Sequence, residues 1–426
     1  MGLSSRARGG VVGAVALAAV LAATSFSFSS NASAAEIVDN GPTPTVSKVS
    51  TANVVGETVA SPAAAEEFWT PERMAAAEPV PMPTPAASSL DIPDFDTGDA
   101  SASAATGDFT PGNVTQFPQV VHGKIFFKVG ANTYTCSGTV IESKGKNVVF
   151  TAGHCVFDLD TKTFATNLAF VPAYENGNDP LGFASAAALY TTPQWATQGA
   201  NAYDIGVAVL DQPAQTALGS RKIAFDLADI LGSLKNLEYT IYGYPSKPNP
   251  PYDGEILRGC HSKFNSFDST QGLKPFPMAA NPCYMQQGAS GGGWVTLGNY
   301  VNSVVSYGYC DNLPNTCGVI FGPYFSNAAK SLYLKAGGSP APTVRVLSAP
   351  PKVVRKRSVS FKFGGSAATL LGFICKLDRQ KAVPCSSKIS IKRLSRGKHT
   401  LKVQAVDQTG KRSRKVIKRS FRVAVR

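Results

Sequence analysis

The region from about residue 113 to residue 338 is built from short apolar segments separated by turn-forming residues, and this texture restricts the folds open to the chain. The clearest segments are residues 123–129, 139–141, 147–150, 205–210, 239–243 and 301–307. Gly, Asn, Asp and Pro bound these segments, which is typical of β-strands joined by close turns. The best helix candidate is Phe325–Ala336. Many short strands over this length predict an all-β barrel architecture.

Three polar motifs lie along this region in the order His, Asp, Ser. Thr151–Cys155 contains His154, Asp204 precedes the apolar segment Ile205–Leu210, and Gly288–Trp294 contains Ser290. A serine hydroxyl needs a base to take its proton as it attacks, and imidazole titrates in the right range. The imidazole in turn needs a carboxylate that fixes its tautomer. The motifs therefore predict Ser290 as nucleophile, His154 as base and Asp204 as the group that orients the base.

Each of these residues also has a plainer explanation when it is taken alone. A Gly-rich run such as Gly288–Gly293 serves as a flexible turn, His154 fits a satisfied core histidine, and Asp204 fits a strand-edge aspartate. Nearby carboxylates compete for the third role: Asp158, Asp160 and Asp211. The chain has four histidines, and of these His154 is the one within a motif. It is the combination of motifs that favours catalysis.

Together the motifs resemble those of the chymotrypsin/trypsin-like serine endopeptidases, which carry them in the same order and at similar spacing. Cys136-Ser137-Gly138 upstream belongs to the same pattern. The resemblance covers about residues 116–338. It implies two six-stranded antiparallel β-barrels, with His154 and Asp204 on the first barrel and Ser290 on the second. It also implies a Cys136–Cys155 bridge beside the base.

The attack on a carbonyl creates an oxyanion, which must be met by backbone N–H groups in a tight loop. We expect those of Gly288 and Ser290 to serve. The resemblance implies that Ser306-Tyr307-Gly308 pairs with the substrate backbone and that Tyr284 lies at the base of the specificity pocket.

The sequence constrains the preferred substrate residue before the cut less than it constrains the catalytic residues. Trypsin-like enzymes carry an aspartate at the Tyr284 position, and glutamate-specific bacterial relatives tend to carry a histidine at the Val305 position. Tyr284 and Val305 therefore favour an apolar or small residue before the cut, whereas Asp311 leaves a basic residue open. Ala289 replaces the aspartate that receives a new N-terminus in many animal enzymes. We thus expect activity without a buried N-terminal salt bridge.

The N-terminal part has the features of an exported chain. Arg6 and Arg8 precede the apolar run Val11–Ala23, and small residues follow. This order predicts a signal peptide over residues 1–34, with a retained anchor as the alternative. Residues 35–112 are acidic and rich in Ala and Pro, and we interpret them as a mostly disordered pro-segment or as a plain linker.

Export also changes the interpretation of the cysteines, because an oxidising compartment favours disulfides over metal ligands. The even number and the order of the cysteines suggest four sequential pairs: Cys136–Cys155, Cys260–Cys283, Cys310–Cys317 and Cys375–Cys385. The sequence shows no metal-ligand spacing and calls for no cofactor.

The C-terminal part carries the basic charge. From residue 341 to the end there are 23 Lys and Arg residues and two acids, whereas the remainder of the chain has a net charge of −8. Residues 339–352 are predicted to be a Pro-rich linker. Residues 353–426 resemble small Ig-like β-sandwich modules of bacterial secreted proteins, in the segments Phe373–Asp378 and Leu394–Asp407. The positive electrostatic field of these residues favours an anionic cell-wall polymer or a membrane surface as the partner. The alternative is a basic surface that is only solvated. The small number of aromatic residues disfavours nucleic acid as a partner.

The sequence therefore predicts an all-β, secreted serine endopeptidase over residues 113–338 that acts on proteins or peptides, followed by a basic Ig-like sandwich. The competing interpretation is an inactive homologue that binds a cell surface or an anionic polymer. An α/β-hydrolase is disfavoured, because that fold carries its residues in the order Ser, Asp, His and needs alternating helices.

Overall fold

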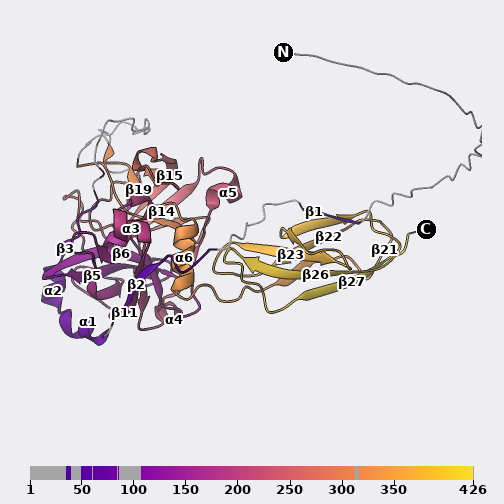
Figure 1. Cartoon of the computed structure of the whole chain (residues 1–426), viewed down its shortest axis with the longest axis horizontal. Coiled ribbons are helices and arrows are strands. Elements are labelled where there is room, and N and C mark those ends of the chain that lie inside the picture. Colours follow the sequence, from indigo (N-terminus) through magenta and orange to yellow (C-terminus); the bar gives the residue numbers. More distant parts are fainter. Residues whose placement is uncertain are drawn as a thin grey trace, which may run out of the picture.

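The computed structural model describes residues 35–39, 49–59, 61–83, 85, 107–311 and 316–425. β-strands dominate, as the sequence predicted. Figure 1 shows two parts, one that holds the elements from β2 to α6 and a second, elongated part built from the C-terminal strands together with β1. The predicted signal peptide lies outside the described residues.

The first part contains a closed antiparallel barrel. Its six strands pair in the order β10 (Thr166–Pro172), β5 (His122–Val129), β6 (Asn132–Ile141), β7 (Val148–Thr151), β12 (Gly206–Leu210) and β11 (Ala184–Thr191). β10 also pairs with β11, which closes the ring. Ile125, Val149 and Phe170 are among the fully buried side chains of its interior.

A second sheet lies against this barrel. It runs in the order β13 (Lys222–Ile223), β18 (Tyr300–Val304), β17 (Gly293–Thr296), β14 (Glu238–Gly243), β15 (Arg258–Phe267), β16 (Met278–Asn281) and β19 (Ile320–Gly322), and β4 (Asp108–Phe109) pairs with β15. Beyond β19 an isolated bridge joins Tyr307 to Phe321. A second closed barrel stays a prediction.

Helices are short and serve mainly to place single side chains. α6 (Asn327–Lys335) lies within the predicted segment Phe325–Ala336. This part also carries α3 (Pro193–Gln198), α4 (Ala214–Leu218) and α5 (Leu227–Leu231), with the 3₁₀ turns η1 (Gln119–Val121), η2 (Gly153–Cys155), η3 (Asn201–Tyr203) and η4 (Ser269–Gln271). In α3, the Thr192 side chain caps the Trp195 N–H, and Gly199 ends the helix in the left-handed region.

Several of the described residues between 35 and 112 form strands and helices, whereas the sequence predicted a mostly disordered pro-segment or a plain linker. β2 (Val55–Thr58) pairs with β11, and β3 (Glu78–Pro79) pairs in parallel with β6. α1 (Ala63–Phe68) and α2 (Pro71–Ala75) lie on the first barrel (Figure 1). Between them Trp69 is 5% exposed and packs against Phe126. The Ala- and Pro-rich composition did not predict these elements, because they are held by one buried aromatic side chain and by backbone pairing.

The C-terminal part is a sandwich of two sheets that share one core. One sheet orders β1 (Glu36–Asp39), β25 (Lys388–Lys392), β22 (Val359–Gly364) and β20 (Arg345–Ser348). The other orders β21 (Val353–Val354), β27 (Ile417–Val423), β26 (Gly397–Asp407), β23 (Leu371–Leu377) and β24 (Val383–Cys385). β20 lies inside the predicted linker 339–352, so the sandwich begins earlier than expected. An Ig-like fold stays a prediction.

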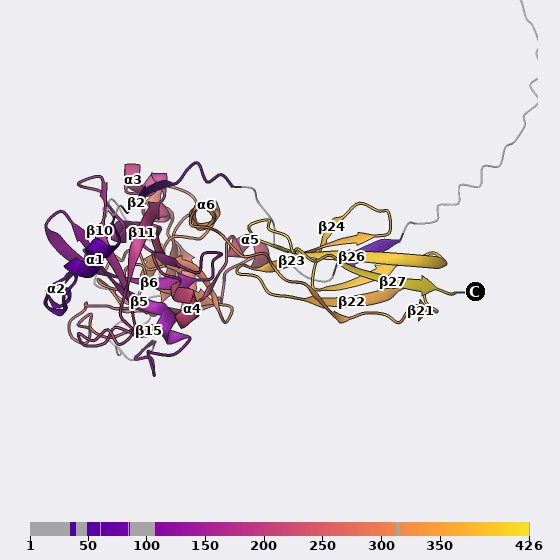
Figure 2. The same cartoon turned by 90° about the horizontal axis from the view of Figure 1, so that it is seen from below.

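The alternation in these strands explains the sandwich. In β22 the side chains of Val359, Phe361 and Phe363 are buried, whereas Ser360 and Lys362 between them are exposed. Figure 2 shows the two sheets extending away from the first part, with β1 alongside the C-terminal strands. The N-terminal residues thus contact both parts of the protein.

Four disulfides join the cysteines in the sequential pairs that their order suggested: Cys136–Cys155, Cys260–Cys283, Cys310–Cys317 and Cys375–Cys385. These disulfides are consistent with an extracellular location. Among the described residues, no helix has the length and apolar character needed to cross a membrane.

Candidate active site

The predicted base and carboxylate are brought together by the ends of neighbouring strands. β7 ends at Thr151 and leads into η2, which carries His154, while Asp204 lies between η3 and β12. The Nδ1 atom of His154 lies 2.7 Å from Oδ2 of Asp204, and the backbone N–H of His154 donates to Oδ1 at 2.8 Å. A Cβ on Gly153 would approach Asp204 and Trp195 to 2.8 Å, so only glycine fits beside the pair. The competitors Asp158, Asp160 and Asp211 are not part of this contact.

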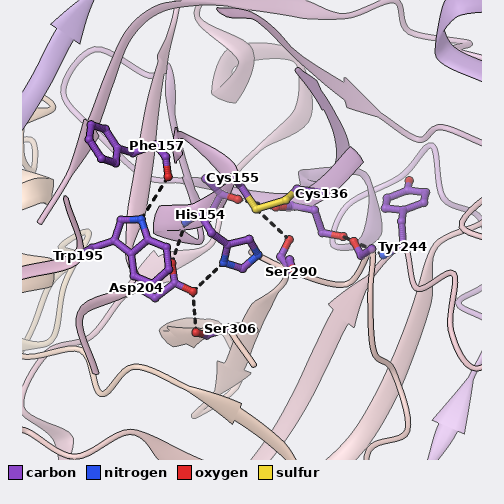
Figure 3. The surroundings of a disulfide bond; sticks show 12 residues. Cys136, His154, Cys155, Phe157, Trp195, Asp204, Tyr244, Ser290 and Ser306 are labelled. Carbon is purple, nitrogen blue, oxygen red and sulfur yellow. Dashed lines mark hydrogen bonds and ion pairs between the residues drawn. A yellow bond between two sulfur atoms is a disulfide. The ribbon is translucent and has the colours of Figure 1, made fainter. Parts of the chain in front are cut away.

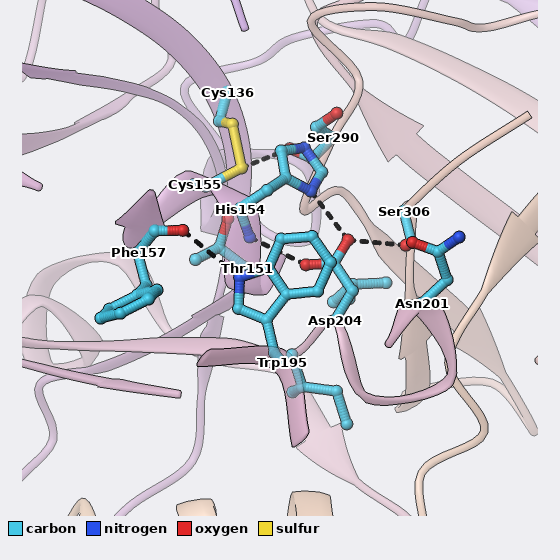
Figure 4. Close-up of polar contacts among 12 residues, drawn as sticks. Cys136, Thr151, His154, Cys155, Phe157, Trp195, Asn201, Asp204, Ser290 and Ser306 are labelled. Atoms are coloured by element: carbon cyan, nitrogen blue, oxygen red, sulfur yellow. Dashed lines mark hydrogen bonds and ion pairs between the residues drawn. A yellow bond between two sulfur atoms is a disulfide. The ribbon is translucent and has the colours of Figure 1, made fainter. Parts of the chain in front are cut away.

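Asp204 is fully buried and also receives a hydrogen bond from the second sheet. The hydroxyl of Ser306 donates to Oδ2 at 2.6 Å. Figure 4 shows these contacts converging on the carboxylate, with the indole of Trp195 beside it. The indole N–H donates to the Phe157 carbonyl at 3.3 Å, and its ring centroid lies 6.1 Å from that of His154. The carboxylate is thus shielded from water and surrounded by hydrogen-bonding groups.

The Nε2 side of the imidazole, opposite to the nitrogen that contacts Asp204, is directed toward Ser290. Figure 3 shows the His154 ring between Asp204 and the Ser290 side chain. Nε2 of His154 and Oγ of Ser290 are both buried, and neither has a hydrogen-bond partner among the described residues. A neutral imidazole with its proton on Nδ1 presents Nε2 as an acceptor. The arrangement therefore leaves a base and a hydroxyl unsatisfied at the same place.

The loop around Ser290 is held in a conformation that depends on glycine. Gly288 has φ +90° and Gly291 has φ +82°. A Cβ on Gly288 would lie 2.4 Å from the Tyr244 carbonyl oxygen. The hydroxyl of Ser137 donates to the Gly288 carbonyl at 2.8 Å, and its N–H donates to the Ser290 carbonyl at 2.7 Å. These contacts tie the loop to β6 and orient its peptide groups.

The peptide N–H groups of the loop fall into two sets. Those of Ala289, Gly291 and Gly292 donate to backbone carbonyls at 2.7–3.0 Å. No acceptor in the described part of the chain takes those of Gly288 and Ser290. These are the two groups that we expected to meet an oxyanion.

The residues predicted to contact substrate differ in burial and in their neighbours. Tyr307 is fully buried, and a Cβ on Gly308 would lie 2.7 Å from Oε1 of Gln286. The ring of Tyr284 lies beside Gly318, where a Cβ would approach Cζ to 3.1 Å. Val305 is fully buried, whereas Asp311 is exposed.

Sequence reasoning missed two residues of this site and one contact of a third. It assigned Ser306 to substrate binding only, although its side chain holds Asp204. It did not single out Trp195, which covers the His154–Asp204 pair, or Gln286, whose amide donates to the Cys317 carbonyl at 3.2 Å. Pro193 and Gly199, which bound α3, are the one local signal that marks the position of Trp195.

The described residues offer no plausible metal centre. Two groups of potential ligands come together, Cys136 with His154 and Cys155, and Asp108 with Cys260 and Cys283. In both groups the sulfur atoms are joined in disulfides, so they cannot act as thiolate ligands.

Comparison with known proteins relates the central part of the chain to proteases. No family model matches the chain. Over 135 residues, or 31% of the chain, it is 26% identical to the glutamyl endopeptidase of Bacillus licheniformis, and the match spans 38% of that protein's length. Protease Anisep from Arthrobacter nicotinovorans is 32% identical over 54% of this chain and 99% of its own, with a TM-score of 0.45. The thermostable serine protease AL20 from an extremophilic microorganism is 32% identical over 51% of this chain and 97% of its own, also with a TM-score of 0.45.

The chain is thus similar in sequence to a glutamyl endopeptidase over about a third of its own length.

Proposed function

We propose that the chain is an exported serine endopeptidase that cuts peptide bonds through Ser290, His154 and Asp204. One observation carries the proposal. The buried Nε2 of His154 and Oγ of Ser290 lack partners among the described residues, while Nδ1 of the same imidazole is held 2.7 Å from the buried Asp204. Neither atom is engaged by another group of the described residues, so both are available for the proton transfer that activates a serine nucleophile.

The mechanism follows from this geometry. As the Ser290 hydroxyl attacks a substrate carbonyl, Nε2 of His154 accepts its proton, and Asp204 stabilises the imidazolium that forms. The carbonyl oxygen becomes an oxyanion, to which the N–H groups of Gly288 and Ser290 donate. The imidazolium then gives its proton to the leaving amine, and an acyl-enzyme remains on Ser290. Water attacks this ester by the same steps in the second half-reaction.

We propose an apolar or small residue before the cut. The glutamyl endopeptidase that matches this chain is named for glutamate, but a charged substrate side chain needs a charged or polar partner in the pocket. Val305 is buried and apolar, and Tyr284 presents its ring to Gly318. Asp311 is exposed on the loop closed by Cys310–Cys317, so cleavage after a basic residue is the alternative to test.

Further features of the whole chain belong to the same proposal. We propose that the second sheet acts as a second barrel, closed where Tyr307 bridges Phe321, and that the sandwich is Ig-like. Secretion follows from the predicted signal peptide and agrees with the four disulfides. Binding of the basic sandwich to an anionic cell-wall polymer stays a prediction.

The test is labelling by a fluorophosphonate, a probe that modifies only an activated serine, followed by casein cleavage. The secreted protein should react and cleave, and Ser290→Ala should abolish both. Ser262→Ala is the matched control, because Ser262 is another buried hydroxyl without a partner among the described residues. Equal loss in both variants would point to misfolding. A folded protein that neither labels nor cleaves would instead favour the inactive homologue.

A further inference from the structure

A buried carboxylate behind the candidate substrate-binding strand has no part in the triad. Asp268 follows β15 and is fully buried. The hydroxyls of Tyr307 and Tyr309 donate to its Oδ2 at 2.6 and 2.7 Å. The N–H and the hydroxyl of Thr270 donate to its Oδ1 at 3.0 and 2.5 Å. None of these four donors is a cation, so neutral hydrogen bonds stabilise the buried group.

The two tyrosines are part of the strand that we expect to bind substrate. They flank Gly308, and Ser306 precedes them. The Tyr307 ring is stacked on Phe321 at 4.9 Å, and the Tyr309 ring meets the same Phe321 edge-on at 5.1 Å. Burial and the neighbouring Asp268 charge raise the pKa of Tyr307 well above its usual value, and burial also raises the pKa of Tyr309. Both hydroxyls are therefore donors to Asp268 at neutral pH.

The same cluster reaches the loop that carries Asp204. The Gln271 amide donates to the Tyr309 hydroxyl at 2.8 Å and accepts from the Asn201 side chain at 3.0 Å. Asn201 begins η3, which ends directly before Asp204. Nearby, the Tyr203 hydroxyl donates to the Lys274 carbonyl at 2.5 Å. The first barrel and the second sheet are thus joined by two hydrogen bonds, from Ser306 to Asp204 and from Asn201 to Gln271.

We propose that Asp268 is a positioning residue for substrate binding, a role that rests on the proposed peptidase function. It fixes Tyr307 and Tyr309 from behind, and so holds residues 306–309 in the position in which their peptide groups can pair with an extended substrate. The residue acts on the part of the substrate before the cut, and the chemistry at Ser290 does not depend on it. Its loss should weaken the binding of long peptides and spare small substrates.

The experiment compares two substrates on Asp268→Asn, which keeps the size of the side chain and one acceptor oxygen. One is a four-residue peptide amide and the other is an ester of its last residue alone. We expect kcat/KM for the peptide to fall by about 10–100-fold, mainly through KM, because small misplacements of a binding element have effects of this size. The ester rate and fluorophosphonate labelling should change by less than about threefold.

The matched control is Asp407→Asn in the sandwich. Asp407 is also fully buried, and it accepts from the N–H and hydroxyl of Thr409 at 3.0 and 2.7 Å, the same local pattern as Asp268 with Thr270. It should leave the ratio of the two substrates unchanged.

If Asp268→Asn does not fold, Tyr309→Phe replaces it, because it removes one donor and keeps the ring. A smaller loss confined to the peptide supports the proposal. An equal loss on both substrates, an unchanged ratio, or the same shift in Asp407→Asn overturns it while the peptidase function stands. A wild-type protein that neither labels nor cleaves overturns the peptidase function, and the role of Asp268 with it.

Discussion

At the scale of single residues, Asp204 joins the two halves of the candidate site. It binds the backbone and ring of His154 from the first barrel and the hydroxyl of Ser306 from the second sheet. The carboxylate therefore fixes both the tautomer of the base and the distance between the two halves. A substitution of Asp204 that keeps the shape of the side chain but changes its donors and acceptors tests the effect on the His154 tautomer separately from the contact between the two halves.

We predict that Asp204→Asn lowers kcat by about 10⁴-fold while the protein stays folded, because an amide at this place favours the wrong imidazole tautomer. Rates on a small ester and thermal unfolding measure the two effects. Ser306→Ala is the comparison, since Asp204 keeps both bonds to His154 and the loss should be much smaller. A mild effect of Asp204→Asn would assign the orienting role to another carboxylate.

Asp108 provides a prediction about pH. It is partly buried, and its Oδ2 accepts from the Tyr252 hydroxyl, while its Oδ1 has no partner among the described residues. Burial raises the pKa of Asp108 to about 6, against the opposing effects of the Tyr284 N–H and the Arg258 charge. The folded protein thus holds a proton that the unfolded chain releases near pH 4.

The sign of the effect follows from this difference. The contribution of Asp108 to stability is fully present below about pH 4 and is lost as the pH rises through 6. Asp108→Asn cannot ionise, so its stability relative to wild type should increase by about 2 kcal/mol between pH 4 and 7. Urea unfolding at several pH values measures this. A constant difference between the two proteins would show that Asp108 titrates normally.

The residues also show where sequence reasoning succeeds. His154, Asp204 and Ser290 stand in motifs whose spacing carries information, and the structure places them together. Trp195, Asp268 and the hydrogen bond from Ser306 to Asp204 were missed, because they depend on tertiary contacts with sequence separations of up to about a hundred residues. No local pattern marks a buried acid that accepts from tyrosines 39 and 41 residues away.

At the scale of elements, the N-terminal segment is the main departure from expectation. Its backbone extends two strands of the first barrel, through β2 on β11 and β3 on β6. Trp69 anchors it between α1 and α2, and its indole N–H donates to the Asn167 carbonyl at 2.6 Å. Composition predicted disorder because averages over many Ala and Pro residues hide a single anchor, and strand addition needs few side-chain signals.

We predict that Trp69→Ala lowers the free energy of unfolding by about 3–5 kcal/mol, since it removes a large buried side chain. Trp69→Phe keeps most of the apolar volume and loses the hydrogen bond, so it should cost about 1 kcal/mol. Urea unfolding followed by circular dichroism measures both. If the segment is a mostly disordered pro-segment or a plain linker, as the sequence suggested, both variants will match wild type.

At the scale of the whole molecule, the sandwich is bound to the first part through backbone groups. The side chain of Gln408 is 1% exposed, donates to the Phe225 carbonyl at 2.5 Å and accepts from the Phe225 N–H at 3.1 Å. The N–H of Ile223 also donates to the Ala368 carbonyl at 3.0 Å. The sequence predicted both parts but not this junction. In the sequence, a glutamine whose side chain hydrogen-bonds the backbone of the other part cannot be told from an exposed polar residue.

This junction predicts how the two parts unfold. Gln408→Ala leaves the buried N–H and carbonyl of Phe225 without partners, at a cost of about 1–3 kcal/mol for each group. The two parts should then unfold separately, whereas in wild type their transitions should coincide. The tryptophans at 69, 195 and 294 all lie in the first part, so fluorescence reports on that part alone. Circular dichroism reports on the strands of both.

The decisive measurement is the separation between the two unfolding curves. In Gln408→Ala the fluorescence and circular dichroism midpoints should diverge. Gln404→Ala is the control, because Gln404 lies on β26, which ends directly before Gln408, and it donates within the sandwich, to the Ser413 carbonyl at 3.2 Å. Gln404→Ala leaves the junction intact, so it should shift both midpoints together and leave no difference between them. Midpoints that already differ in wild type would mean that the junction is too weak to couple the parts, and that the sandwich moves independently of the candidate active site.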